Sequence, residues 1–298
     1  MEQQKDIKKI IIPIAGLGTR FLPLSNVISK EFLPLVDKPV IQYIIEEVKN
    51  SGIEEVVFVV NPGRKNILDY FKKNTELEKL LVKRKKDKIL KELKDFEEVF
   101  RGISFSCVVQ KEPLGDGHAI LQAAKYVNNE PVAVSFGDDI VYSDKPAIAQ
   151  LMEIFKTCQA PVVALKQMPV DKISAYGVVD VEKIANNLFK IKKFVEKPEA
   201  SKAPSNLAIV GKYILTPEVF QYLKKTGTKG NPERNGEIVL AEIFEKMLAD
   251  GKFIYGCELK GEWLECGDKL KWIKSFFYLA LKDERFKDEL KQYIKTIK

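Results

Sequence analysis

An arginine and a lysine follow a glycine-rich loop near the start of the chain. Residues 15–20 read Ala-Gly-Leu-Gly-Thr-Arg, directly after the apolar run at 10–14, and Lys30 lies ten residues beyond Arg20. Small residues let backbone N–H groups approach a polyphosphate closely, and cationic side chains can then neutralise its charge. The order of strand, glycine loop, arginine and lysine therefore indicates nucleotide chemistry near the start of an α/β fold.

Two common phosphate-binding motifs do not match this loop. A dinucleotide fingerprint needs a third glycine where Phe21 stands, and an acidic residue after the second strand to bind a ribose. That strand is expected over residues 55–60, and Asn61 and Pro62 follow it. A Walker loop needs Gly-Lys-Ser or Gly-Lys-Thr after four spacer residues, which this loop lacks. NAD, FAD and P-loop chemistry are therefore disfavoured, and on the Gly-x-Gly pattern alone a plain turn stays open.

The glycine loop continues into a longer pattern that resembles a known family. From Gly16 to Pro39 the order is Gly-x-Gly-Thr-Arg, about ten residues, and then Lys-Glu-x-Leu-Pro-x-x-x-Lys-Pro. This string resembles the signature of the sugar-1-phosphate nucleotidyltransferases, and most closely that of the members that use UTP and glucose 1-phosphate. Further blocks match the family in order through nearly the whole chain: Gly115-Asp116-Gly117-His118, Gly137-Asp138-Asp139, Ala175-Tyr176-Gly177, Val195-Glu196-Lys197-Pro198, Pro204-Ser205-Asn206 and Cys266-Gly267.

The resemblance implies transfer of a uridylyl group. A phosphate oxygen of glucose 1-phosphate attacks the α-phosphorus of UTP, UDP-glucose forms and pyrophosphate leaves, without a covalent enzyme intermediate. The nucleophile is already an anion, so the enzyme needs no general base and must instead align two polyanions and neutralise their charge. Arginine, lysine and Mg²⁺ suffice for this, which agrees with the presence of a single histidine, His118.

The resemblance assigns the nucleotide to residues in the first half of the chain. Arg20 would stabilise the triphosphate and the departing pyrophosphate, because a guanidinium binds phosphate oxygens in a bidentate fork. Lys30 would add a point charge near the phosphates. The other implied nucleotide-binding positions, whose backbone and amide groups could read the pyrimidine edge, are Ala15, Gly16, Gly18, Gln110 and Gly115.

The resemblance also implies a metal site of two acidic residues. Asp138 follows an apolar run, and a carboxylate there suits Mg²⁺, which prefers few protein oxygens together with phosphates and water. The second acidic residue is Glu265, where the family usually has aspartate. Its extra methylene moves the carboxylate, so whether Glu265 touches the metal directly is left open.

The implied sugar-phosphate site draws on later motifs. Glu196 would accept hydrogen bonds from glucose hydroxyls, and Lys197 would pair with the phosphate. Gly177 would let the backbone approach the sugar ring, and Asp139 would face the sugar.

Alternating patterns predict the elements that position these residues. Strands are expected at 8–14, 55–60, 103–109 and 131–136, and helices at 39–51, 64–72, 76–98 and 116–126. This alternation predicts an α/β fold with a Rossmann-like, mixed, mostly parallel sheet flanked by helices. Ligands in such sheets bind at the carboxyl ends of strands, where Arg20, Gln110 and Asp138 are expected.

The second half has a different pattern. Strands joined by short turns are expected at 162–166, 178–182, 189–195 and 207–215, and a helical pattern runs from about 268 to the end. We expect one nucleotidyltransferase domain over 1–298, with a nucleotide-binding half to about 160, a sugar-binding half to 267 and C-terminal helices over 268–298. Trp272, Phe276, Phe277 and Leu279 could pack on the core or on a partner subunit.

Composition limits the class of protein. The 298 residues are 45% hydrophobic and 31% charged, enough to bury a substantial core. No apolar run approaches the ~20 residues of a transmembrane helix, and the polar N-terminus lacks the apolar centre of a signal peptide. The four cysteines include no Cys-x-x-Cys pair, which is typical of reduced thiols. We therefore expect a cytoplasmic enzyme with no membrane partner. Separately, we expect a homodimer or homotetramer.

The net charge of +7 fits small anionic substrates but does not exclude nucleic acid. The densest basic run, 83–88, leads into helical spacing without interleaved aromatic residues, so it predicts a solvated helix face and no nucleic-acid partner.

Two alternatives remain within the family resemblance. Glucose-1-phosphate thymidylyltransferases use dTTP for the same chemistry, but they tend to have glycine where Ala15 stands and to lack the insertion around 76–100. A catalytically silent regulatory relative is disfavoured because Arg20, Lys30, Asp138 and Lys197 are all present.

Overall fold

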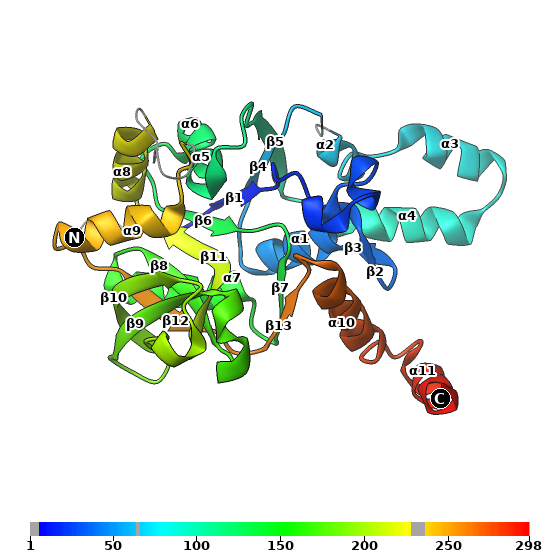
Figure 1. Ribbon diagram of the computed structural model, residues 1–298. Helices are drawn as coiled ribbons and strands as arrows, with labels where there is room; N and C mark the ends of the chain where they lie inside the picture. The colour runs from blue at the N-terminus through cyan, green and yellow to red at the C-terminus, as the bar shows by residue number, and fades with distance from the viewer. Residues whose placement is uncertain (1–5, 64–65, 228–235, 298) are drawn as a thin grey trace.

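The computed structural model describes residues 6–63, 66–227 and 236–297. Within these residues a nine-stranded sheet runs through the molecule in the order β5-β4-β1-β6-β11-β8-β12-β10-β9 (Figure 1). Its strands are β1 (Lys9–Pro13), β4 (Glu55–Val60), β5 (Ser104–Val109), β6 (Val132–Ser135), β8 (Val162–Gln167), β9 (Gly177–Lys183), β10 (Leu188–Glu196), β11 (Leu207–Leu215) and β12 (Tyr255–Glu258). The predicted strands are all present, and those at 55–60 and 207–215 have the expected bounds.

Helices cover both faces of the sheet. The α-helices are α1 (Val40–Asn50), α2 (Ile67–Tyr70), α3 (Thr75–Lys83), α4 (Asp87–Val99), α5 (Gly115–Gln122), α6 (Ala124–Val127), α7 (Ala147–Cys158), α8 (Pro217–Gly227), α9 (Leu240–Ala249), α10 (Lys269–Ala280) and α11 (Lys287–Thr296). Short 3-10 turns are η1 (Thr19–Phe21), η2 (Leu24–Asn26), η3 (Lys30–Phe32), η4 (Val170–Ala175) and η5 (Ala200–Lys202). Two small ribbons pair β2 (Pro34–Leu35) with β3 (Lys38–Pro39), and β7 (Asp139–Tyr142) with β13 (Glu262–Glu265).

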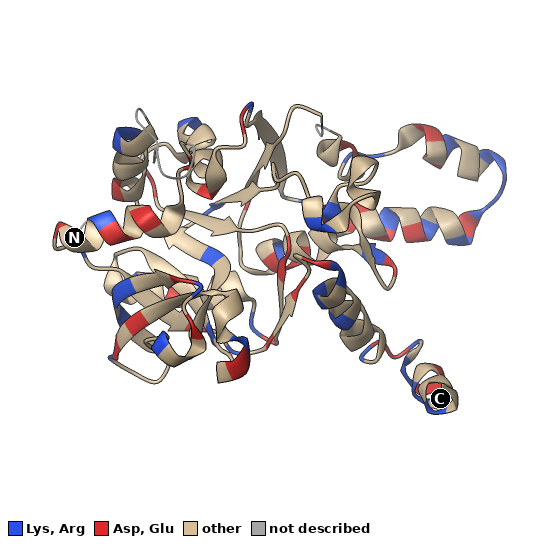
Figure 2. Cartoon of the chain, in the orientation of Figure 1, with Lys and Arg blue, Asp and Glu red and all other residues tan. Residues whose placement is uncertain are grey.

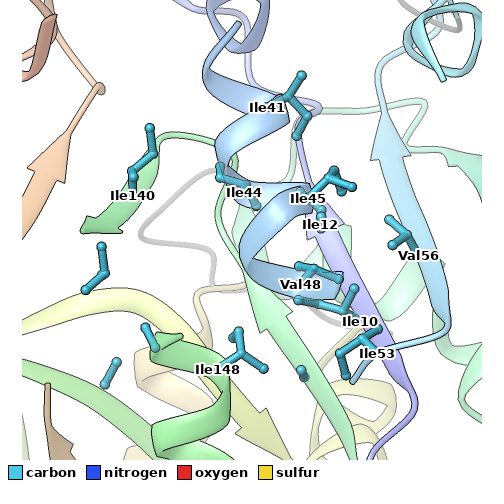
Figure 3. Close-up of a cluster of buried hydrophobic side chains, with 14 of the residues drawn as sticks. Ile10, Ile12, Ile41, Ile44, Ile45, Val48, Ile53, Val56, Ile140 and Ile148 are labelled. Atoms are coloured by element: carbon cyan, nitrogen blue, oxygen red, sulfur yellow. The ribbon is translucent and has the colours of Figure 1, made fainter. Parts of the chain in front are cut away.

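Two hydrophobic cores lie on opposite faces of the sheet, and alternate side chains of β1 contribute to each. Ile10 and Ile12 face a cluster that includes residues of α1 and α7, whereas Ile11 faces a second cluster with residues of α5, α8 and α9. Figure 3 shows how the apolar stripe of α1, including Ile44 and Val48, packs over β1 and β4. The central strands are buried on both faces, so their carboxyl ends are held rigidly at one edge.

The prediction of a mostly parallel sheet is wrong for the second half. β5, β4, β1 and β6 pair in parallel, but β11 pairs antiparallel with β6 and with β8, and β10 pairs antiparallel with β12 and β9. Among the strands described in that half, only β8 and β12 pair in parallel. Short turns such as the one between β9 and β10 can join only antiparallel neighbours, because a parallel pair needs a long crossover. The sheet is therefore mixed.

The helix expected over 76–98 is broken into two. α3 and α4 are separated by a turn in which Lys85 has φ 52°, a left-handed conformation that ends a helix. The two helices pack together and project from the body of the molecule, and the basic residues gather at their turn (Figure 2). The run at 83–88 is exposed, so it forms a solvated tip where a helix face was expected.

Helix α10 lies beside the small ribbon of β7 and β13, and α11 follows it further from the body of the molecule (Figure 1). On α10, Leu279 is buried and Trp272 and Phe276 pack against the core, whereas Phe277 is exposed. Among the helices described, none combines the length and apolarity that a membrane crossing needs.

Candidate active site

A cavity of about 320 Å³ opens where the parallel strands end. Residues from the carboxyl ends of β1, β5 and β6 meet there, as expected for an open α/β sheet. Of the predicted nucleotide and metal residues, it is lined by Ala15, Gly16, Lys30, Gln110, Gly115 and Asp138. The structure thus brings together residues that are far apart in the sequence.

The glycine loop and the start of α5 form two sides of this cavity. Gly18 has φ 68° and precedes η1, which carries Arg20. Gly115 has φ 90°, and a Cβ atom there would lie 2.5 Å from the carbonyl oxygen of Ile238. Both positions favour glycine, because other residues adopt this backbone only with strain.

The side chain of Gln110 is fixed in the cavity wall. Its amide nitrogen donates to the carbonyl of Gly115 at 3.1 Å and lies 2.9 Å from Nδ1 of His118. The other ring nitrogen of His118 lies 2.9 Å from the amide nitrogen of Gln122. Burial lowers the pKa of His118, opposed by the nearby carboxylate of Glu112. His118 therefore acts by holding Gln110, a supporting role.

Lys30 is ion-paired with Asp138 across the cavity. Burial alone would lower the pKa of Lys30, but the carboxylates of Asp138 and Glu31 outweigh it and raise the pKa. Glu31 lines the same cavity and is almost fully buried, and burial raises its own pKa. The Lys-Glu-x-Leu-Pro motif pointed to this stretch, but the motif alone predicted no role for Glu31.

Arg20, Asp138 and Glu265 converge around Gly267. A Cβ atom placed on Gly267 would lie 3.2 Å from Oδ2 of Asp138 and 3.6 Å from Nη1 of Arg20. It would also lie 3.6 Å from Oε1 of Glu265. The absence of a side chain at Gly267 therefore leaves space beside one guanidinium and two carboxylates.

This donor set fits Mg²⁺ bound together with substrate. Among residues 6–63, 66–227 and 236–297, no group of three or more histidine, cysteine or acidic side chains is arranged to hold a metal ion. Mg²⁺ is usually bound through one or two carboxylates and completes its octahedron with phosphate oxygens and water. Asp138 and Glu265 supply that number of carboxylates beside the cavity.

Asp139 occupies a different place from the one expected. It is buried, Oδ1 accepts from Nε1 of Trp263 at 2.7 Å and Oδ2 accepts from the N–H of Gly211 at 3.1 Å. Burial, reinforced by the adjacent Asp138, raises its pKa to about 7. Consecutive residues entering a strand point to opposite faces, so Asp138 faces the cavity while Asp139 turns to protein donors and not to the space where a sugar was expected.

The predicted sugar residues lie at a neighbouring edge of the sheet. Gly177 at the start of β9 pairs with Glu196 at the end of β10, and both line a cavity of about 120 Å³. A Cβ atom on Gly177 would lie 3.2 Å from Oε2 of Glu196. Lys197 has φ 45°, and its ammonium lies 3.3 Å from Oε1 of Glu196. The exceptional backbone at Lys197 thus lets two neighbours turn toward each other at a strand end.

The two cavities adjoin through one stretch of chain. Glu237 lines the larger cavity and Val239 the smaller one, while Ile238 between them donates its N–H to Leu114 at 2.8 Å. Residues two positions apart in the chain therefore line the two cavities.

Two residues without a role predicted from the sequence contact Glu265. The hydroxyl of Tyr176 donates to Oε2 at 2.9 Å, and the ammonium of Lys271 lies 2.5 Å from Oε1. Burial, together with the Glu265 carboxylate, raises the pKa of Tyr176, so its hydroxyl stays protonated. Tyr176 belonged to a recognised motif, whereas Lys271 carried no sequence signal.

A glycine loop, two cationic side chains and an acidic pair at the carboxyl ends of the parallel strands are typical of a nucleotide-binding transferase. The chain matches the family described as Nucleotidyl transferase over residues 9–282, and it belongs to this family. It is 42% identical to UTP–glucose-1-phosphate uridylyltransferase 1 of Staphylococcus saprophyticus, across 98% of this chain and 99% of that protein. It is also 42% identical to the UTP–glucose-1-phosphate uridylyltransferase of Staphylococcus haemolyticus, with the same coverage.

Solved structures give the same result. A UTP-bound UGPase from Acinetobacter baumannii superposes with a TM-score of 0.88 at 33% identity, covering 98% of this chain and all of that one. A UDP-glucose pyrophosphorylase complexed with UDP-glucose superposes with a TM-score of 0.80 at 35% identity, covering 93% of this chain and all of that one. The resemblance inferred from the motifs is therefore confirmed.

Proposed function

We propose that the chain joins UTP and glucose 1-phosphate to form UDP-glucose and pyrophosphate. The observation that carries this proposal is the convergence of Arg20, Asp138 and Glu265 around Gly267, beside the cavity that Lys30 lines. The relatives named UTP–glucose-1-phosphate uridylyltransferase cover nearly the whole chain, which supports the same reaction.

The nucleotide occupies the larger cavity in this proposal. Backbone groups of Ala15, Gly16 and Gly18 approach the nucleotide, and Gln110 and Gly115 bind its base. Arg20 and Lys30 bind the phosphates and stabilise the charge that develops on departing pyrophosphate. Mg²⁺, held by Asp138, supplies further positive charge to the phosphates when it is bound.

The sugar phosphate occupies the smaller cavity and its mouth. Glu196 accepts hydrogen bonds from glucose hydroxyls, and Lys197 binds the phosphate and directs an oxygen toward the α-phosphorus of UTP. The backbone at Gly177 permits close approach of the sugar, and Asp139 supports the site from its buried position beside Trp263. Attack by an anion in line with the leaving group needs alignment and charge neutralisation, and no covalent intermediate.

The chain works as one domain in this proposal. Residues to about 160 bind the nucleotide, residues to 267 bind the sugar, and the helices beyond contribute to assembly. Exposed apolar side chains on α10 and α11, including Ile273, Phe277 and Tyr293, support a homodimer or homotetramer formed through these helices. We also propose a cytoplasmic location. Light scattering would show a monomer if the assembly proposal is wrong.

Pyrophosphate release over a grid of nucleoside triphosphates and sugar 1-phosphates tests the reaction. UTP with glucose 1-phosphate should be the best pair, and UDP-glucose with pyrophosphate should run the reverse reaction. A preference for dTTP would support a thymidylyltransferase instead. No product with any pyrimidine triphosphate would support a silent relative.

A further inference from the structure

Both oxygens of Glu265 are occupied by the protein itself. Oε2 accepts the hydroxyl of Tyr176 at 2.9 Å, and Oε1 lies 2.5 Å from the ammonium of Lys271. The side chain of Glu265 is only 17% exposed, although all three side chains border an open cavity of about 820 Å³. Lys271 also lies over the ring of Tyr176, 4.6 Å from its centroid. The three side chains thus form one packed unit.

This unit lies between Asp138, the proposed metal ligand, and the start of β9, which belongs to the proposed sugar site. Oε1 of Glu265 and Oδ2 of Asp138 border the same space at Gly267. On the other side, the carbonyl of Tyr176 accepts the N–H of Lys197 at 3.1 Å, and Tyr176 directly precedes Gly177. A shift of Glu265 would therefore move the residue that anchors the start of β9.

Lys271 competes with a metal ion for Glu265. A divalent cation could bind Oε1 directly only if the carboxylate left the ammonium, and separating a partly buried ion pair costs free energy. Asp138 is also ion-paired, but its partner Lys30 has phosphates to bind once substrate arrives. Lys271 extends from the first turn of α10, and its ammonium contacts Oε1 of Glu265, the same oxygen that borders the space at Gly267.

We propose that Lys271 and Tyr176 are positioning residues that hold Glu265 back from the metal, leaving Asp138 as the direct protein ligand. Tyr176 also fixes the position of β9 relative to Asp138 and Glu265. The inference rests on the proposed function for its metal site. It predicts that removing the charge of Lys271 releases Glu265 and makes the free enzyme bind a divalent cation more tightly.

The first test measures Mn²⁺ binding to the full chain by electron paramagnetic resonance, without substrate. Lys271→Met should tighten Mn²⁺ binding by roughly tenfold, the scale on which groups around metal ligands act. Lys271→Arg keeps the charge and should restore the original affinity. The double variant Lys271→Met with Glu265→Gln should lose the gain, because the released carboxylate is then absent. Lys274→Met, an exposed lysine one turn along the same helix, serves as the control and should change nothing.

The second test separates the role of Tyr176. Tyr176→Phe keeps the ring and removes the hydroxyl, so it should raise the KM for glucose 1-phosphate several-fold while leaving the KM for UTP unchanged. Equal changes in both KM values would overturn this role.

The outcomes distinguish this inference from the proposed function. If Asp138→Asn weakens Mn²⁺ binding but Lys271→Met leaves it unchanged or weaker, the positioning role alone is overturned. If Asp138→Asn has no effect on Mn²⁺ binding, both the metal site of the proposed function and the positioning role are overturned.

Discussion

Lys30 and Asp138 form an ion pair although 108 residues separate them in the sequence. Lys30 comes from the turn η3 near the first strand, and Asp138 follows β6, which pairs with that strand in parallel. The parallel pairing of β1 and β6 thus brings a cation and a carboxylate to one cavity. In the proposed function, a phosphate group that enters this cavity would contact the ammonium, and a metal ion would contact the carboxylate.

Arg20→Ala should lower turnover by roughly 10²–10³-fold, the usual cost of deleting one preorganised electrostatic donor. The melting temperature should stay the same, because Arg20 is exposed on a loop. Arg101→Ala, which removes an exposed arginine after α4, is the matched control and should leave turnover unchanged. Near-normal turnover in the Arg20 variant would assign this residue a peripheral role.

Asp138→Asn keeps the size of the side chain and removes its charge, so activity should collapse and Mg²⁺ activation should require more metal. Glu265→Gln should do less, because its carboxylate is held by Tyr176 and Lys271. Steady-state rates over a Mg²⁺ titration compare the two variants. A larger defect in Glu265→Gln would reverse the assignment of the two acidic residues.

Glu196 and Lys197 should differ in how they recognise the sugar phosphate. Lys197→Ala should raise the KM for every sugar 1-phosphate, since phosphate is common to all. Glu196→Ala should mainly reduce discrimination between sugars, because a site built to hydrogen-bond a hydroxyl rejects analogues that lack it.

A panel of sugar 1-phosphates at saturating UTP measures this difference. Lys193→Ala, on the exposed side of the same strand, is the control. Equal losses on all sugars in both test variants would exclude separate roles, and a large loss of UTP affinity would place the pair outside the sugar site.

Lys212→Ala should destabilise the fold by about 3–5 kcal/mol, the usual cost of leaving one partner of a buried ion pair alone. Lys212 is fully buried, and its ammonium lies 3.0 Å from Oε2 of Glu47 and 2.9 Å from Oγ of Ser135. Urea denaturation measures the change in the free energy of unfolding. Lys192→Ala breaks an exposed pair with Glu182 and should cost at most about 1 kcal/mol. Similar losses in the two variants would contradict the buried role.

The single imidazole of the chain should titrate below its ordinary pKa of 6.5, because burial disfavours its charged form. The folded protein then binds this proton less tightly than the unfolded chain does. His118 therefore contributes stability that is fully present above pH 6.5 and is lost as the pH falls from 6.5 toward the lowered pKa of the folded protein.

Proton NMR of this one histidine gives the pKa directly. Unfolding measured between pH 5 and 7.5 should show a weaker pH dependence in His118→Asn. A resonance that titrates at or above 6.5 would disprove the prediction.

Local sequence patterns alone determined the positions of the strands, the type of chemistry and the family of this protein. Apolar runs bounded by turns located the strands at 55–60 and 207–215, because the hydrophobic periodicity of a strand is visible within a few residues. The order of the glycine loop, Arg20 and Lys30 indicated nucleotide chemistry, and the ordered motifs identified the family. The rule that ligands bind at the carboxyl ends of parallel strands placed Gln110 and Asp138 at one edge.

Only the tertiary structure decided how distant elements meet. The directions of β8–β12 depend on which strand edges pair, and this is not encoded in any single strand. Asp139 turned to Trp263 because β7 pairs with β13, 124 residues further along the chain. Lys271 contacts Glu265 because α10 begins just after β13, which places the first turn of the helix beside the carboxylate. Such contacts arise when elements distant in the sequence pack together, so the local periodicity of the sequence cannot predict them.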